Sequence, residues 1–177
     1  MSNSDRRNKI MFITLTAVFT ALVYVFTAFV NIKLPIGQGG LIHLGNVPLF
    51  ICAILLGRKS GAIAGALGMA AFDLVCGWTL WAPFTFVIVG LMGFVVGTIA
   101  EKKSSLPWYS LACVAAIGIK IVGYYIAEWV IYGDMIAPAL SIPGNIIQVA
   151  TASVIVLFAI KPIEFSVKKA GIRVCIK

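Results

Sequence analysis

A few ionisable side chains interrupt long apolar segments, and these side chains are the ones best able to do chemistry. Lys120, Tyr124 and Glu128 are spaced by four residues, so they share one face if their segment is helical. Asp73 stands near the end of another apolar segment. If these apolar segments cross a membrane, charged groups within them are costly and usually face a cavity or one another. Lys120, Glu128 and Asp73 are therefore either structural ion-pair partners or, like Tyr124, contacts for a ligand.

Further polar and aromatic residues stand at the ends of the apolar segments. Trp78 and Trp81 lie in a turn, where tryptophan either anchors the chain at the membrane surface or stacks on a flat ligand. Asn145 either caps a helix or contributes to a pocket, and the single histidine, His43, is either structural or a ligand contact. The candidate substrate-binding residues are His43, Asn46, Asp73, Trp78, Trp81, Lys120, Tyr124, Glu128, Asn145 and Gln148.

Motifs of other functional classes are missing from the sequence. It has no GxxxxGK[ST], HExxH or GxSxG pattern, and its four cysteines show neither ligand spacing nor a disulfide framework. No basic stripe with interleaved aromatic residues suggests nucleic-acid binding. We therefore expect no enzyme, no metal site, no cofactor and no nucleic-acid partner.

The composition indicates a protein embedded in a lipid bilayer. Of 177 residues, 61% are hydrophobic and 11% charged, whereas a soluble domain is about 45–50% apolar and about 25% charged. A domain this small cannot bury such an excess, because much of its surface stays exposed. Since a spanning helix uses about 20 residues, the length predicts one membrane domain, residues 1–177, with six spans.

The apolar runs predict an all-α, polytopic fold with helices over residues 10–30, 47–56, 62–76, 84–100, 108–131 and 145–160. The second helix would be only about 15 Å long at 1.5 Å per residue, which is too short for the hydrocarbon core. Either residues 41–46 enter the membrane as non-helical backbone and form a pocket wall, or a tilted helix begins earlier, near Gly40. The sequence leaves both possibilities open.

Basic residues fall at every second boundary between the predicted helices, which is the positive-inside pattern. This pattern predicts that both termini are cytoplasmic. Glycines also recur at spacing four, in the rows Gly57, Gly61, Gly65 and Gly93, Gly97, which predicts close packing of helix backbones.

Several of these features together resemble the substrate-binding S component of energy-coupling factor (ECF) vitamin transporters. They are the six-helix organisation, the short second helix, the pair Ala17-xxx-Ala21 and the stretch GGLIHLGNVPLFICAILLGRKSGAIAGALGMAAFDLVCG. The most specific part is residues 43–73, with its LGN and LLGRKSGAIAGALG patterns. The resemblance covers nearly the whole chain.

The resemblance implies a vitamin bound near the outer surface beneath loops. It also implies partners, namely a transmembrane T component, which Ala17 and Ala21 would contact, and two cytoplasmic ATPases. The S component would topple in the bilayer to release its cargo inward.

Within the family, the sequence is similar to members linked with pyridoxine or hydroxymethylpyrimidine, while riboflavin, pantothenate and folate remain open. A stand-alone secondary transporter is the alternative, with Lys120, Glu128 and Asp73 as an ion or proton relay. A structural subunit without a ligand is a third hypothesis.

Overall fold

The computed structural model describes residues 3–33 and 41–171 of the chain. Within these ranges it has the helices α1 (Asn3–Phe29), α2 (Asn46–Leu56), α3 (Arg58–Val75), α4 (Ala82–Ala100), α5 (Leu106–Tyr132) and α6 (Ile142–Lys169). The short elements are β1 (Asn31–Lys33), β2 (Leu41–His43) and the 3-10 helix η1 (Ala137–Ser141). The predicted all-helical class is confirmed, and the strand pair is an addition that the sequence did not predict.

Four stretches are long and apolar enough to cross a membrane, namely Asp5–Phe29, Ala82–Ala100, Leu106–Tyr132 and Ala137–Lys169. The 11-residue α2 is also apolar but shorter. The 18 residues of α3 include the charged residues Arg58, Lys59 and Asp73, and this helix is not among the four long apolar stretches.

Several helices extend beyond their predicted ranges. The first begins at Asn3 rather than near residue 10, and the sixth runs from Ile142 to Lys169 rather than from 145 to 160. Hydropathy marks only the apolar part of a helix, whereas the helical backbone continues into the polar ends. Pro162 lies inside α6 without ending it. Because α6 begins at Ile142, the interpretation of Asn145 as its N-cap is wrong.

The short helix α2 is the centre of the bundle, with ten of its eleven residues buried. It begins at Asn46, so the alternative of a helix that starts near Gly40 is wrong. Residues 41–43 instead form β2, which pairs antiparallel with β1 so that Asn31 lies opposite His43. The side chain of Asn31 also donates to the Thr27 carbonyl at 3.0 Å, which satisfies a carbonyl at the end of α1.

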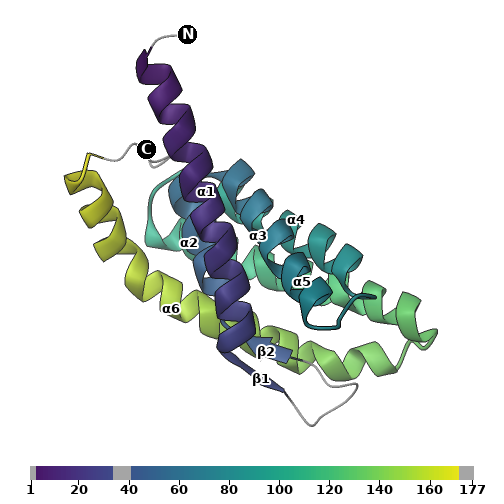
Figure 1. Cartoon of the computed structure of the whole chain (residues 1–177). Helices are drawn as coiled ribbons and strands as arrows, with labels where there is room; N and C mark the ends of the chain where they lie inside the picture. The colour runs from purple at the N-terminus through teal and green to yellow at the C-terminus, as the bar shows by residue number, and fades with distance from the viewer. Residues whose placement is uncertain (1–2, 34–40, 172–177) are drawn as a thin grey trace.

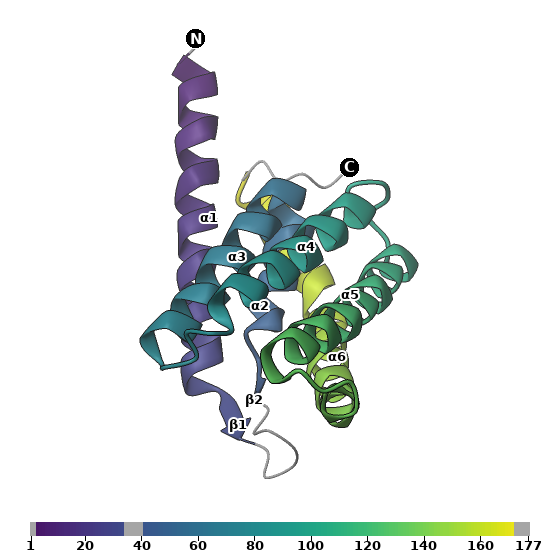
Figure 2. The same cartoon turned by 90° about the vertical axis from the view of Figure 1, so that its right-hand side faces the viewer.

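Glycines bring α3 and α4 into backbone contact, as the spacing of the two glycine rows predicts. A Cβ atom on Gly61 would lie 2.7 Å from the carbonyl oxygen of Gly93, and one on Gly65 would lie 2.8 Å from that of Val89. The two helices run side by side in both ribbon views (Figures 1 and 2). Figure 2 also shows that the N-terminal part of α1 extends beyond the other helices. The predicted role of these glycines in packing is confirmed.

Candidate substrate-binding site

A buried hydrogen bond joins His43 on β2 to Gln148 on α6. The Gln148 amide meets Nε2 of His43 at 2.8 Å, and both side chains are buried. Nδ1 of the same ring accepts the N–H of Gly45 at 3.2 Å. The proton of a neutral ring is then on Nε2, and the Gln148 amide accepts it when its oxygen faces the ring. The hydrogen bond fixes β2, and so the start of α2, against α6.

Asn46 follows directly as the first residue of α2. Its side chain is 0% exposed, and neither its amide nitrogen nor its amide oxygen has a hydrogen-bond partner among the described residues. A buried polar group without a partner costs about 1–3 kcal/mol. The fold therefore holds an amide at a place where packing alone would favour an apolar side chain.

A second group of polar side chains comes from α3, α4 and α5. The Nζ atom of Lys120 lies 4.9 Å from the centre of the Tyr124 ring, one helical turn further on. The Tyr124 hydroxyl is 3.2 Å from that of Thr85, which also lies beside the carboxylate of Asp73. Lys120 is near enough to Asp73 and His43 to interact electrostatically with both. These contacts bring side chains from β2, α3, α4 and α5 into one neighbourhood.

Among the described residues, Lys120 and Asp73 do not form the direct ion pair that one interpretation of the sequence predicted. In the described part of the chain, the ion pairs within 4.0 Å join Arg58 to Glu101 and Lys161 to Glu164. Lys120 is only 2% exposed, and Oδ2 of Asp73 is buried without a hydrogen-bond partner among residues 3–33 and 41–171. Both groups keep capacity for a further hydrogen bond.

Glu128 differs from its neighbours on α5 because it has a local partner. Ser141, at the end of η1, lies 2.7 and 2.6 Å from the two carboxylate oxygens and 2.9 Å from the Pro138 carbonyl. A serine hydroxyl has one proton, so it donates to only one of these oxygens at a time. Glu128 thus ties η1 to α5 and still has an oxygen available.

Aromatic rings cover this neighbourhood at the start of α4. The Trp81 ring centre lies 6.1 Å from that of Tyr124 and also 6.1 Å from that of Tyr132. Trp78 is half-buried in the preceding turn and holds that turn through its backbone N–H, which donates to the Asp73 carbonyl at 2.8 Å. Trp81 therefore packs against the α5 tyrosines, whereas the backbone hydrogen bond of Trp78 lies within the turn.

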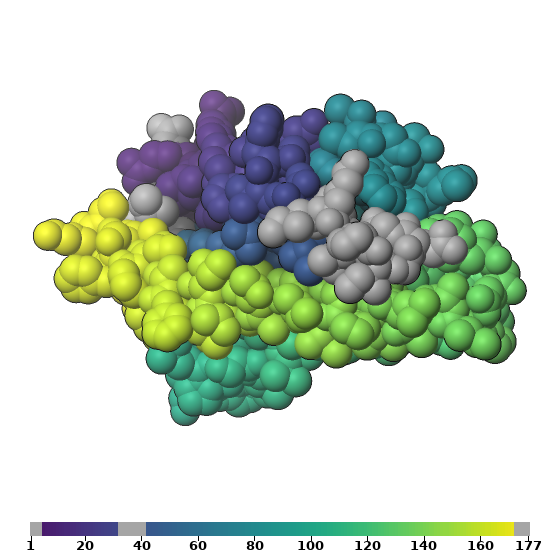
Figure 3. Space-filling model, turned by 90° about the horizontal axis from the view of Figure 1, so that it is seen from below, coloured from purple at the N-terminus to yellow at the C-terminus, as the bar shows by residue number. Residues whose placement is uncertain are grey.

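Contacts thus link six of the candidate residues toward the end of the bundle that carries β1 and β2, namely His43, Asp73, Trp81, Lys120, Tyr124 and Gln148. Figure 3 looks onto this end, where the last turn of α1, the α3–α4 connection and the α5–α6 region meet. Asn145, in the first turn of α6, is half-buried. Sequence reasoning missed three residues, Thr85, Tyr132 and Ser141, because a lone hydroxyl in an apolar run carries no pattern. Among the described residues no three His, Cys, Asp or Glu side chains gather in a way that could hold a metal ion.

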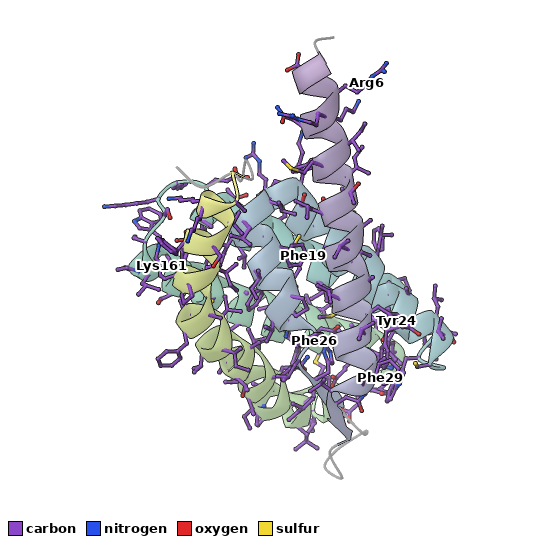
Figure 4. The ribbon with its side chains drawn as sticks, turned by 60° about the vertical axis from the view of Figure 1, so that its left-hand side comes forward. Arg6, Phe19, Tyr24, Phe26, Phe29 and Lys161 are labelled. Carbon is purple, nitrogen blue, oxygen red and sulfur yellow. The ribbon has the colours of Figure 1, made fainter. Side chains whose placement is uncertain are left out.

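Another polar cluster, also missed from the sequence, joins the α4–α5 turn to the last part of α6. Glu164 is 5% exposed and accepts from the Tyr109 hydroxyl, from Lys161 Nζ at 2.7 Å and from the Ser104 hydroxyl at 3.3 Å. Lys161 also lies 5.0 Å from the centre of the Tyr109 ring. Figure 4 labels Lys161 on α6. These contacts of the Glu164 carboxylate are all with residues of the same chain, so we interpret the cluster as structural. We call it the clamp between α6 and the α4–α5 turn.

The predicted partner-contact residues lie on the surface of α1. Ala17 and Ala21 are both exposed, whereas Thr16 and Val23 on the opposite face are buried. The Thr16 hydroxyl is 2.7 Å from that of Ser60 on α3, which fixes how α1 faces the bundle. The small side chains of the alanine pair are therefore free of contacts that would bury them within this chain.

The sequence and the fold of this chain are both similar to those of known proteins. Residues 7–164 match the model of the family described as "ECF-type riboflavin transporter, S component". The thiamine precursor transporter HmpT of Lactococcus lactis subsp. cremoris (strain MG1363) is 28% identical over 88% of each chain. The biotin transporter BioY of Thermotoga maritima is 33% identical over 58% of this chain and 64% of that protein. A crystal structure of the S component for biotin from an ECF-type ABC transporter superposes with a TM-score of 0.64 at 18% identity, covering 91% of this chain and 95% of that one.

Proposed function

The chain belongs to the family of ECF-type transporter S components, and we propose that it captures hydroxymethylpyrimidine or pyridoxine for an ATP-driven importer. Membership makes it a multi-pass membrane protein of vitamin transport that binds its substrate and is not an enzyme. The cargo, the subunits that drive uptake and the orientation in the membrane are the parts that we propose here.

The observation that carries the proposal is the set of buried polar atoms without partners beside β2. The Asn46 amide and Oδ2 of Asp73 are buried and unpaired among the described residues, and Lys120 is buried without a carboxylate within 4.0 Å there. Such groups destabilise a fold unless something bonds to them. A small molecule with its own donors and acceptors would supply the missing partners.

The neighbouring side chains favour a small, flat and polar cargo. Trp81 and Tyr124 offer aromatic faces, while Asn46 and Lys120 offer hydrogen bonds, which is a usual composition for a small-molecule site. A hydroxylated pyrimidine or pyridine ring matches both features. The similarity to a thiamine precursor transporter over 88% of each chain supports this choice. Biotin, riboflavin, pantothenate and folate are the competing cargoes, of which biotin and riboflavin appear in the names of matching proteins.

The proposed topology has six spans with both termini in the cytoplasm. α2 and α3 would complete the set begun by the four long apolar stretches, because α2 is buried in protein and need not cross the lipid alone. Arg58 and Lys102 lie at the end of the helices opposite β2, so under the positive-inside rule the candidate site would face outward. A T component and two ATPases would then supply the work, with Ala17 and Ala21 facing the T component.

Calorimetry on the purified full-length protein tests the cargo. The ligands are hydroxymethylpyrimidine, pyridoxine, biotin, riboflavin, pantothenate and folate, each titrated into wild type, Lys120→Met and the control Lys168→Met. We expect one-to-one binding of hydroxymethylpyrimidine or pyridoxine, weakened at least about tenfold by Lys120→Met alone, since a hydrogen bond to a charged group contributes about 1.5–3 kcal/mol. Tight binding of biotin or another vitamin instead would overturn the choice of cargo.

Proteoliposomes test the energy source. Uptake should require the T component and both ATPases together with ATP. Uptake by the protein alone, driven by an ion gradient and abolished in Asp73→Asn, would favour the secondary transporter in which Asp73, Lys120 and Glu128 relay an ion.

A further inference from the structure

A cavity of about 620 Å³ that is widely open to the surface lies at the end of the bundle opposite β1 and β2, where α1, α2, α3 and α4 meet. We call it the basic cavity. Its lining includes Phe12, Leu56, Arg58, Lys59, Glu101 and Lys102. It shares no residue with the candidate substrate-binding site.

The charges around the basic cavity are unbalanced. Arg58, Lys59 and Lys102 face one carboxylate, that of Glu101. This carboxylate is already engaged, because Oε1 accepts the backbone N–H of Arg58 at 2.9 Å and Oε2 lies 3.7 Å from Nε of Arg58. The N-terminal end of α3 adds its positive partial charge at the same place. An anion bound there would meet the side chains of Lys59 and Lys102, which are exposed and form no ion pair within 4.0 Å among the described residues.

The depth of the basic cavity matches a membrane surface. α4 has 19 residues and runs from Ala82, next to Trp81, to Ala100, next to the cavity. At 1.5 Å per residue the helix is about 28 Å long, close to the hydrocarbon thickness of about 30 Å. The cavity therefore lies where lipid headgroups stand, about one hydrocarbon thickness from the tryptophan end.

The walls of the basic cavity are apolar as well as basic. Phe12 and Leu56 contribute to its lining, and Phe94 on the outer face of α4 is 42% exposed beneath the Arg58 guanidinium, 5.8 Å from the ring centre. Ile13, next to Phe12 on α1, is 57% exposed. An inorganic anion gains nothing from contact with these apolar surfaces, whereas the acyl chains of a lipid pack on them. Figure 4 shows Arg6 on the part of α1 that extends past the bundle at this end.

We propose that the basic cavity binds the phosphate group of an anionic phospholipid, with Arg58, Lys59 and Lys102 around the phosphate and the acyl chains along α1 and α4. The chemistry of the headgroup is that of a phosphodiester, which a free phosphate shares in part. Basic pockets between helices at the membrane surface are suited to such headgroups. This site goes beyond the proposed function and does not depend on which vitamin is bound.

Native mass spectrometry of the full-length protein tests the proposal. The protein is released from micelles that contain phosphatidylglycerol or phosphatidylcholine, and the fraction with one bound lipid is measured for wild type, the double variant Lys59→Gln/Lys102→Gln and the control Lys168→Gln/Lys169→Gln. The control removes the same charge from exposed residues of α6 outside the cavity. We expect phosphatidylglycerol affinity to fall at least about tenfold in the first double variant and to stay unchanged in the control, since each basic residue near an anionic surface contributes about a factor of five.

Three results would overturn the proposal. An equal loss of phosphatidylglycerol in both double variants would mean that the lipid responds to general surface charge. Binding of phosphatidylcholine as strong as that of phosphatidylglycerol would mean that the site does not distinguish the charge of the headgroup. Full displacement of the lipid by inorganic phosphate at equal concentration would mean that the site binds a free anion. A steric variant, Thr98→Trp, places a bulky side chain in part of the same cavity without changing charge. It should also release phosphatidylglycerol, while unchanged binding would contradict the assigned place. Vitamin binding is measured by calorimetry on the same samples. A failure of the lipid proposal with vitamin binding intact is thereby distinguished from a failure of the proposed function.

Discussion

The amide of Gln148 on α6 meets the imidazole of His43 on β2 at 2.8 Å, across 105 residues of sequence. This contact joins the strand that precedes α2 to the helix that ends the bundle. Asn46, three residues after His43, is buried with no hydrogen-bond partner among the described residues. One polar side chain thus has a partner within the fold and its neighbour has none among the described residues, a difference that experiments can test.

The His43–Gln148 hydrogen bond should show measurable coupling. Gln148→Leu leaves Nε2 of His43 unpaired, whereas His43→Phe leaves both the Gln148 amide and the Gly45 N–H unpaired. Each lost partner should cost about 1–3 kcal/mol in free energy of unfolding. The double variant should be less destabilised than the sum of the two, by about 1 kcal/mol. Unfolding in mixed micelles measures all four proteins. Strictly additive effects would show that the two side chains do not stabilise one another.

Asn46→Leu should weaken cargo binding without destabilising the protein. The amide lacks a partner, so an apolar side chain of similar volume should leave the unfolding free energy unchanged or raise it by up to about 1–3 kcal/mol. Cargo affinity should fall about tenfold or more, equivalent to about 1.4 kcal/mol. Calorimetry and thermal unfolding measure the two quantities, with Asn8→Leu on α1 as the matched control. Loss of stability together with loss of binding would instead make Asn46 a structural residue.

Ala17→Trp and Ala21→Trp should impair assembly with the T component and leave cargo affinity unchanged. Both alanines are exposed on α1, so a bulky side chain there meets no atoms of the same chain that would be displaced. Ala71→Trp places the same change on an exposed position of α3 and serves as the control. Co-purification with the T component and ATPases reports assembly. If Ala71→Trp disrupts the complex equally, the effect is not specific to the alanine pair.

Glu164→Leu should destabilise the protein through the clamp between α6 and the α4–α5 turn. The change removes the acceptor that Tyr109 and Lys161 share in a buried place, which should cost about 1–3 kcal/mol in free energy of unfolding. Glu164→Gln keeps an acceptor oxygen and should cost less. Thermal unfolding compares the two, and cargo affinity should be unchanged in both. An equal cost for Leu and Gln would show that the charge, rather than the hydrogen bonds, holds the clamp.

The sequence by itself determined the class of the fold and where polar groups stand in it. Apolar runs and their lengths are local properties, so they predicted a helical membrane protein, and glycines at spacing four predicted the backbone contact that Gly61 and Gly93 make. The same hydropathy pattern misplaced the ends of α1 and α6, because a helix continues where its residues turn polar.

Only the tertiary structure decided which polar groups are paired. Sequence spacing puts Lys120 and Tyr124 on one face of α5. It does not predict that Thr85 from α4 contacts Tyr124 or that His43 from β2 lies near Lys120. The partners of a buried group come from segments far apart in the chain, and their meeting depends on how the helices pack around α2. That packing satisfies Gln148 and leaves Asn46 open, a difference that no local pattern in the sequence encodes.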